Sequence, residues 1–249
     1  SKCGHPDAMW NKRVNEKEMR KDLKKSLEEL KTDYIDIYML HRDDPDTEVA
    51  VAVETFNAMH EEGNIGAFGA SNWTHTRIEE ANEYAYKHNL IPFSVSSPNF
   101  CLARQIEDPW GGGCVNISGP ENQEARAWYE KNQMPVIAYA SLGRGFFSGR
   151  MKSEYADHAS DYLDSFAMTG YACSDNFERL RRCEIIAEKH GVTVAQIAMN
   201  WIFSHPLNIF AIASMSKADR MKANREALLL QLSDEEIAYL DLETPEFCG

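Results

Sequence analysis

The chain has 249 residues, of which 43% are hydrophobic, so it is long enough to bury one substantial core. Its formal net charge of −13 disfavours nucleic acid and anionic membranes as partners. No apolar run approaches the ~20 residues that span a bilayer, and no targeting segment opens the chain.

The cysteine content favours a cytoplasmic setting. Six cysteines occur without C-x-x-C pairing and without the density of a disulfide framework, so reduced thiols are expected: Cys3, Cys101, Cys114, Cys173, Cys183 and Cys248. Cys3 and His5 lack a second ligand pair at zinc-like spacing, which favours ordinary packing over a metal site.

The first half of the chain alternates helices with strands. The periodicity of the apolar residues predicts helices over 15–31, 47–62 and 75–88, and strands over 34–41, 65–70 and 91–96. Gly63 is placed to cap the second helix, and Asp43-Asp44-Pro45 stops the strand that ends at His41.

A long loop over residues 98–120 interrupts this rhythm. Its triple glycine, Gly111-Gly112-Gly113, lacks the surroundings of a phosphate-binding loop and is better read as a flexible segment. Helices then follow at 122–133, 175–190, 193–204, 217–229 and 234–241, strands at 135–140 and 207–213, and an irregular stretch at 141–173. Alternating strands and helices indicate a parallel sheet with right-handed crossovers, in one domain over residues 1–249.

Polar residues stand at the ends of successive predicted strands. They are Lys2, His41, Ser71-Asn72, Ser96-Ser97, Tyr139 and Ser214. In parallel β/α folds the carboxyl ends of strands carry the chemistry, so the set favours a site, although a lone histidine there is as often a hydrogen-bonded core residue. Ser141 lacks the G-x-S-x-G turn of serine hydrolases.

Arg220 and Asn224 lie one turn apart on the predicted helix that follows the last strand. Most such pairs belong to an exposed helix face. The functional alternative is recognition of the adenine end of a nucleotide, because arginine both stacks on rings and contacts phosphate.

Taken together, these residues resemble the aldo/keto reductase family. Lys2 resembles its catalytic lysine, and Asp33-Tyr34-Ile35-Asp36-Ile37-Tyr38 leading to His41 resembles the segment that carries its catalytic histidine. Further matching segments are Phe68-Gly69-Ala70-Ser71-Asn72-Trp73, Tyr139 in Ala-Tyr-Ala-Ser-Leu-Gly, Val192 to Trp201, and the pair Arg220 and Asn224.

The resemblance implies an α/β fold, a (β/α)8 TIM barrel of aldo/keto reductase type that is N-terminally incomplete in this chain. It implies reduction of an aldehyde or ketone by NADPH, favoured over NADH, with Lys2 and His41 as catalytic residues. The cofactor contacts it implies are Ser71, Asn72, Ser96, Tyr139, Leu142, Ser214, Arg220 and Asn224. No metal is expected, and Trp73 and Trp110 are candidates for the wall of a pocket for sugar-like carbonyls.

Three departures qualify this resemblance. Ser96 stands where many members have glutamine, and Ser214-Met215 stands where a Lys-Ser pair often grips the 2′-phosphate. The family's catalytic aspartate and tyrosine lie upstream of the lysine, so the first two β/α units and most of the third strand are expected outside this sequence. An upstream segment or a partner chain would then cover the open barrel edge. The alternative is a non-catalytic barrel remnant that binds a nucleotide or another protein.

Overall fold

The computed structural model describes residues 1–214 and 218–245. Met215 and Cys248, named above, lie outside the described residues, and the other five cysteines are free thiols. Contacts between Cα atoms group the chain into two compact units. Unit 1 comprises Ser1–Pro98, Gly113–Val115 and Lys131–Val136, and unit 2 comprises Asn99–Gly112, Asn116–Glu130 and Ile137–Gly249. The single domain remains a prediction.

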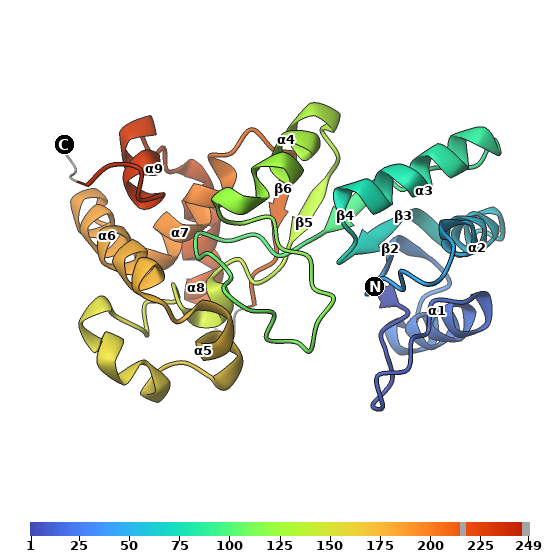
Figure 1. Cartoon of the computed structure of the whole chain (residues 1–249), viewed down its shortest axis with the longest axis horizontal. Helices are drawn as coiled ribbons and strands as arrows, with labels where there is room; N and C mark the ends of the chain where they lie inside the picture. The colour runs from blue at the N-terminus through green and yellow to red at the C-terminus, as the bar shows by residue number, and fades with distance from the viewer. Residues whose placement is uncertain (215–217, 246–249) are drawn as a thin grey trace. The chain divides into compact units, whose positions relative to one another are not determined.

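The described residues form six strands in the hydrogen-bonded order β1-β2-β3-β4-β5-β6. The pairings from β1 to β5 are parallel, which confirms the predicted parallel sheet (Figure 1). The strands are β1 (Lys2–Cys3), β2 (Ile35–Leu40), β3 (Ile65–Ser71), β4 (Val95–Ser97), β5 (Val136–Ala138) and β6 (Ile209–Ala211).

The helices begin and end close to the predicted residues. They are α1 (Glu16–Leu30), α2 (Val49–Glu61), α3 (His75–Lys87), α4 (Gln123–Asn132), α5 (Ser165–Tyr171), α6 (Ser174–His190), α7 (Val194–Phe203), α8 (Ala218–Glu226) and α9 (Asp234–Leu240). The prediction of an irregular stretch over 141–173 is wrong in part. Asp164 accepts a hydrogen bond from the backbone N–H of Ala167 and so begins α5, and 3-10 turns occupy Gly143–Gly145 and Ser153–Asp161.

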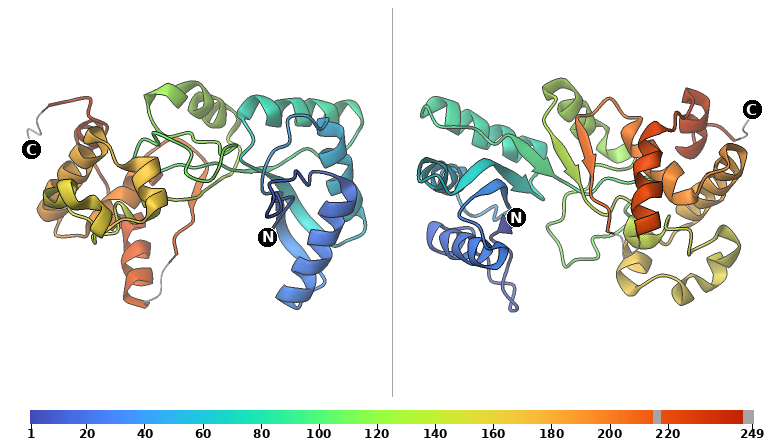
Figure 2. Two further views of the ribbon diagram at one scale, coloured as in Figure 1. Left: turned by 60° about the horizontal axis from the view of Figure 1, so that its bottom comes forward. Right: turned by 180° about the vertical axis from the view of Figure 1, so that it is seen from behind.

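In unit 1 the helices α1, α2 and α3 lie side by side along the strands β1 to β4 (Figures 1 and 2). Beneath α2 an aromatic cluster fills the interface between helix and sheet. The rings of Phe56 and Phe68 stack 5.3 Å apart, and Phe93 packs edge-on against both. This apolar packing holds the strands in register, so the polar residues at their carboxyl ends are placed together.

The strand predicted over 91–96 is shorter than expected, because β4 begins at Val95. Two asparagine side chains from the preceding helices bind the backbone upstream of it. Asn57 Oδ1 accepts from the N–H of Ile91, and Asn82 Oδ1 accepts from the N–H of Phe93. Backbone donors satisfied by side chains are unavailable to a sheet ladder, so this segment runs in irregular conformation to the start of β4.

Unit 2 is built mainly of helices, with α7 packed against α6, α8 and the 3-10 turn Ala227–Leu229. Both predicted capping boxes are present. Thr193 and Gln196 bond reciprocally at the start of α7, and Ser233 and Glu236 do the same at the start of α9.

Replacing Thr193 with alanine is expected to lower the free energy of unfolding by about 1 kcal/mol, because the N–H of Gln196 loses its cap. Urea unfolding at neutral pH measures the change. Thr169→Ala, at an exposed position of α5, serves as the control and is expected to stay within about 0.5 kcal/mol of the parent. Equal losses in the two variants would show that the capping box does not stabilise α7.

Candidate active site

A lysine ammonium group links three strand ends of unit 1. Lys2 Nζ on β1 donates to Ser71 Oγ at 2.9 Å and to Ser97 Oγ at 3.1 Å. Ser71 ends β3 and Ser97 ends β4, and both side chains are fully buried. We call Lys2, His41, Arg42, Ser71, Asn72 and Ser97 the Lys2 cluster.

The register of the sheet explains why these serines meet. Ser71 pairs with Ser97 across β3 and β4, and the Ser71 hydroxyl donates to the Ser97 carbonyl at 2.8 Å. Gly69 lies two residues earlier, where an added Cβ would collide with the carbonyl oxygen of Val95, so the strands approach closely only because this residue is glycine. Side chains alternate along a strand, which places Ser97 on the same face as Ser71 and Ser96 on the opposite one.

Asn72 ties the ends of β2 and β3 to the loop at 113–115. Its backbone has φ +60°, in the left-handed region that asparagine tolerates better than most residues. Its Nδ2 donates to the His41 carbonyl at 3.0 Å and to Ser71 Oγ at 3.3 Å, and its Oδ1 accepts from the N–H of Val115 at 3.2 Å. Asn72 therefore fixes the backbone on which His41 is carried.

Two cations lie together in the Lys2 cluster. Burial, and to a smaller extent the charge of Arg42, lower the pKa of Lys2 from 10.5 to about 8, while Cys114 acts in the opposite direction. Arg42 is itself buried, and its Nη1 donates to the Cys114 sulfur. An ammonium group with a pKa near 8 stays charged at neutral pH but holds its proton weakly.

The His41 imidazole is neutral at neutral pH. Burial lowers its pKa from 6.5 to about 4, and the positive charges of Lys2, His5 and Arg42 contribute in the same direction. The rings of His5 and His41 meet edge-to-face with centroids 4.8 Å apart. A neutral imidazole carries one N–H, which can donate a hydrogen bond to an oxygen atom without transferring a charge.

This lowered pKa predicts how the stability of the fold depends on pH. A histidine whose folded pKa is depressed stabilises the fold fully above its unfolded value near 6.5. That stability is lost as the pH falls toward 4, because only the unfolded state takes up the proton. After allowance for solvent screening of a half-buried ring, we expect a loss of roughly 1–2 kcal/mol.

Urea unfolding at several pH values between 4 and 7.5 measures this dependence. His41→Gln is expected to flatten the curve over this range, whereas the exposed His88→Gln leaves it unchanged. A curve that falls equally steeply in His41→Gln would assign the pH dependence to other groups.

Tyr139 and Leu142 lie in unit 2, in the turn that follows β5. The Tyr139 ring packs edge-on against Trp110 with centroids 5.7 Å apart. Ala140 adopts φ +53°, and Leu142 accepts a backbone hydrogen bond from Phe147. The neighbouring Ser141 hydroxyl bonds the carbonyls of β5 and Ile212, so it has a structural role here.

Ser214, Arg220 and Asn224 also lie in unit 2. Ser214 precedes α8 and is exposed. Arg220 and Asn224 both lie on α8, where Arg220 is exposed and Asn224 is half-buried. Among the described residues, the Arg220 guanidinium has no ion pair or hydrogen bond, so it is accessible to an anion from solution.

Two residues around Lys2 were not predicted from the sequence, and one predicted pocket residue is misplaced. Ser97, expected only as one of the polar strand-end residues, accepts a hydrogen bond from the ammonium group, and Arg42 and Cys114 complete its electrostatic surroundings. Strand parity places Ser97 on the face of Ser71, whereas Cys114 follows a glycine-rich loop with no periodicity. Trp73 is only 1% exposed and packs against Phe93, so the prediction that it lines a pocket is wrong.

A family model described as the aldo/keto reductase family matches residues 1–242. The chain belongs to the aldo/keto reductase family. A crystal structure of the thermostable aldo-keto reductase Tm1743 is similar with a TM-score of 0.65 and 21% identity, over 92% of this chain and 67% of that one. The fold is therefore that of the family's β/α barrel. The predicted absence of two β/α units is not supported by a match that covers nearly the whole chain.

Curated relatives resemble this chain at low identity. Aldo-keto reductase str7 of Strobilurus tenacellus is 26% identical, over 86% of this chain and 59% of its own length. Aryl-alcohol dehydrogenase GME11368 of Pestalotiopsis microspora is 24% identical, over 96% and 57%. A putative voltage-gated potassium channel subunit beta of Schizosaccharomyces pombe is 22% identical, over 94% and 62%. The chain thus spans about three fifths of the length of these relatives.

In residues 1–214 and 218–245, no helix has both the length and the apolar character needed to cross a membrane. The same residues contain no group of three or more histidine, cysteine or acidic side chains that could hold a metal ion.

Proposed function

We propose that the Lys2 cluster is the catalytic centre of a carbonyl reductase that uses a nicotinamide cofactor. The observation that carries this proposal is the pairing of a buried ammonium group, Lys2, with a neutral imidazole, His41, at the ends of neighbouring strands. A reduction of this kind adds a hydride to the carbonyl carbon and a proton to its oxygen. The two side chains match those needs.

His41 would act on the carbonyl oxygen. Its neutral N–H donates a hydrogen bond that polarises the C=O bond and strengthens as negative charge develops on the oxygen. Its low pKa keeps the ring from protonating at neutral pH, so it binds the oxygen without acting as the acid. Asn72 holds the His41 backbone carbonyl and thereby positions the ring.

Lys2 would act on the proton donor. Its charge lowers the pKa of a neighbouring hydroxyl group and so eases proton transfer to the developing alkoxide. The hydrogen bonds to Ser71 and Ser97 restrict its ammonium group to one place. We propose that the donor hydroxyl comes from an upstream segment or a partner chain that joins the edge strand β1.

The two ends of the cofactor fit the chain to different degrees. When bound, the dihydronicotinamide supplies the hydride. The Ser71 hydroxyl donates to Ser97 and accepts from Lys2 and Asn72, and both amide hydrogens of Asn72 are donated within the chain. A carboxamide that bonds to either side chain as a hydrogen-bond acceptor would therefore have to displace one of these bonds. Arg220 and Asn224, one turn apart on α8, suit the phosphate and adenine of the other end. An accessible arginine favours NADPH over NADH.

Ser96, Tyr139, Leu142 and Ser214 complete the proposed cofactor contacts, with Tyr139 stacking on the nicotinamide ring. We propose an aldehyde or ketone substrate, with sugar-like and aromatic carbonyls as the classes to test. The second class is suggested by the name of the aryl-alcohol dehydrogenase relative. A cytoplasmic location accords with the free thiols of the described cysteines.

A second function has an observation of its own in its favour. The hydrogen-bond donors of Ser71 and Asn72 are already used within the chain, which weakens the proposed contact with the nicotinamide carboxamide. In addition, one relative is named as a putative channel subunit. A barrel that binds a nucleotide or another protein without turnover would share these features.

Titration of the natural gene product with NADPH, alongside turnover of benzaldehyde and an aldose, separates the two functions. Binding with turnover supports the reductase, and binding without turnover by the complete gene product supports the second function. An NADH affinity equal to that for NADPH would contradict the role of Arg220.

A further inference from the structure

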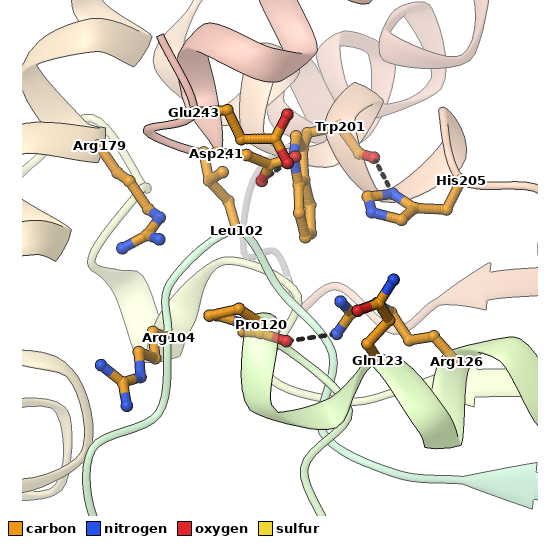
Figure 3. A pocket seen from close by; sticks show the side chains of 11 residues that line it. Leu102, Arg104, Pro120, Gln123, Arg126, Arg179, Trp201, His205, Asp241 and Glu243 are labelled. Atoms are coloured by element: carbon orange, nitrogen blue, oxygen red, sulfur yellow. Dashed lines mark hydrogen bonds between the residues drawn. The ribbon is translucent and has the colours of Figure 1, made fainter. Parts of the chain in front are cut away.

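Unit 2 contains a cavity of about 230 Å³, and none of its lining residues is proposed above for catalysis or cofactor binding. Its walls come from the loop after β4, residues 119–126, the helices α6 and α7, and the segment after α9 (Figure 3). Its volume corresponds to roughly eight water molecules at ~30 Å³ each, which suits a monosaccharide and is too small for a dinucleotide.

Arg179 on α6 is buried and Arg126 on α4 is half-buried, and neither contacts a carboxylate. Arg179 is 7% exposed, and its one hydrogen bond is a long contact of 3.3 Å to Asn176 Oδ1. Arg126 donates only to the backbone carbonyls of Ile117 and Gly119. Neither guanidinium lies within 4.0 Å of a carboxylate oxygen among the described residues. A buried cation that no anion contacts is costly, so each guanidinium gains from a further acceptor.

Two carboxylates lie between these arginines. Figure 3 shows Arg179 and Arg126 on opposite sides of the cavity, with Asp241 and Glu243 between them. Asp241 Oδ1 accepts from Trp201 Nε1 at 3.0 Å, and neither carboxylate forms an ion pair within the described ranges. Burial lowers the pKa of both arginines, and the charge of Asp241 opposes this in each case. Asp241 therefore acts on both guanidinium groups without touching either.

The charges around the cavity balance one another. Arg104 also lines it but pairs with Glu121 at 3.1 Å, which leaves two arginines and two carboxylates among the described lining residues. Burial lowers the pKa of His205, so that ring adds no charge at neutral pH. An anion would meet Asp241 and Glu243, and a cation would meet the arginines. The lining therefore favours an uncharged ligand with both hydrogen-bond donors and acceptors.

A hydroxyl group suits the gap between a guanidinium and a carboxylate. It accepts a hydrogen bond from the one and donates to the other, so it joins two groups that lie too far apart for an ion pair. The order arginine, carboxylate, arginine offers two such gaps, which two hydroxyl groups on neighbouring carbons can fill. Leu102, Pro120 and Trp201 also line the cavity and offer apolar surface to C–H groups.

We propose that this cavity binds a neutral polyhydroxylated compound, a monosaccharide or a cyclic polyol. One hydroxyl group bridges Arg179 and Asp241, and a neighbouring one bridges Asp241 and Arg126. Glu243 accepts from a third hydroxyl group at the exposed rim of the cavity. Ordered water is the competing occupant, since a water molecule also donates and accepts.

Three neutral probes differ in the orientation of their hydroxyl groups: methyl α-D-glucopyranoside, methyl α-D-galactopyranoside and myo-inositol. None has an aldehyde or ketone group, so none can be reduced at the Lys2 cluster. Isothermal calorimetry of the natural gene product at pH 7.5 compares them with two charged analogues, the anion methyl α-D-glucopyranosiduronate and the cation methyl 6-amino-6-deoxy-α-D-glucopyranoside.

At least one neutral probe is expected to bind about 10-fold or more tightly than either charged analogue. Equal or tighter binding of the anion or the cation would overturn the proposal in favour of a charged ligand. No binding by any neutral probe would overturn it in favour of water alone.

Variants connect the binding to this cavity. Arg179→Gln and Asp241→Asn are each expected to weaken binding of the tightest neutral probe by about 10-fold or more, because each removes a hydrogen bond to a charged group. Arg181→Gln is the matched control, because Arg181 lies on the same helix but pairs with Glu178 at 2.7 Å. Unchanged affinity in both cavity variants, or an equal loss in Arg181→Gln, would contradict the assignment.

Glu243→Gln keeps the test decisive if the other variants fail to fold, because Glu243 is exposed. It should leave the melting temperature unchanged and weaken binding by about 3-fold or more. The tightest neutral probe should raise the melting temperature of the parent protein but not that of Asp241→Asn. A lower melting temperature in ligand-free Asp241→Asn, with no rise in the parent, would indicate a structural charge network and overturn the proposal.

Discussion

Replacing Lys2 with methionine is expected to lower carbonyl reduction by about 10³-fold, because general acid–base assistance typically contributes 10²–10⁴-fold. The loss should appear in kcat, since the ammonium group is proposed to act on the proton donor rather than on substrate binding. Lys2→Arg should not restore activity, because a planar guanidinium cannot replace a compact ammonium held between Ser71 and Ser97. Steady-state kinetics of the natural gene product measure both variants.

The same substitution is expected to stabilise the fold. A shift of the Lys2 pKa from 10.5 to about 8 corresponds to roughly 3 kcal/mol of unfavourable burial and repulsion by Arg42 at neutral pH. Two lost hydrogen bonds, at about 1 kcal/mol each, offset most of it, which leaves a gain of about 1 kcal/mol. Because the folded pKa is depressed, this gain is full below pH 8 and disappears as the pH rises toward 10.5.

Lys24→Met provides the control for both effects, since Lys24 is exposed on α1. It should change neither turnover nor the pH dependence of unfolding. A Lys2→Met variant that is inactive but also less stable at pH 7 would indicate that Lys2 stabilises the fold. It would contradict the proposal that the buried charge of Lys2 costs stability and serves catalysis.

Replacing His41 with alanine is expected to lower kcat/KM for an aldehyde by about 10²–10³-fold, the usual cost of removing one hydrogen-bond donor to a developing oxyanion. The affinity for NADPH should stay unchanged, because the ring is proposed to contact the substrate oxygen. Stopped-flow reduction together with fluorescence titration separates these two quantities.

His5→Ala is the matched control, because its ring contacts that of His41. If the His41 effect came from packing alone, both variants would lose activity to a similar degree. A large loss confined to His41→Ala would support hydrogen-bond donation. Full activity in His41→Ala would contradict its role.

Local sequence rules predicted much of this fold because its elements obey them. The periodicity of α1 and the reciprocal caps of α7 and α9 depend on residues within a few positions of one another. The beginning of β4 could not be predicted, since it depends on Asn57 and Asn82, which reach it from two other helices.

The Lys2 cluster was predicted only in part for a similar reason. Strand ends can be read from the sequence, so Lys2, His41, Ser71, Asn72 and the pair Ser96-Ser97 were found. Which of the two serines on β4 accepts from the ammonium group depends on register, and it is Ser97.

Deuterium transfer tests the central claim most directly. NADPH labelled with deuterium at C4 of the nicotinamide is incubated with an aldehyde and the natural gene product, and the alcohol is examined by mass spectrometry. We predict that the label appears on the carbinol carbon, at a rate that Lys2→Met lowers by about 10³-fold. Equal rates of transfer in the parent and in Lys2→Met would contradict the account, as would an alcohol without the label.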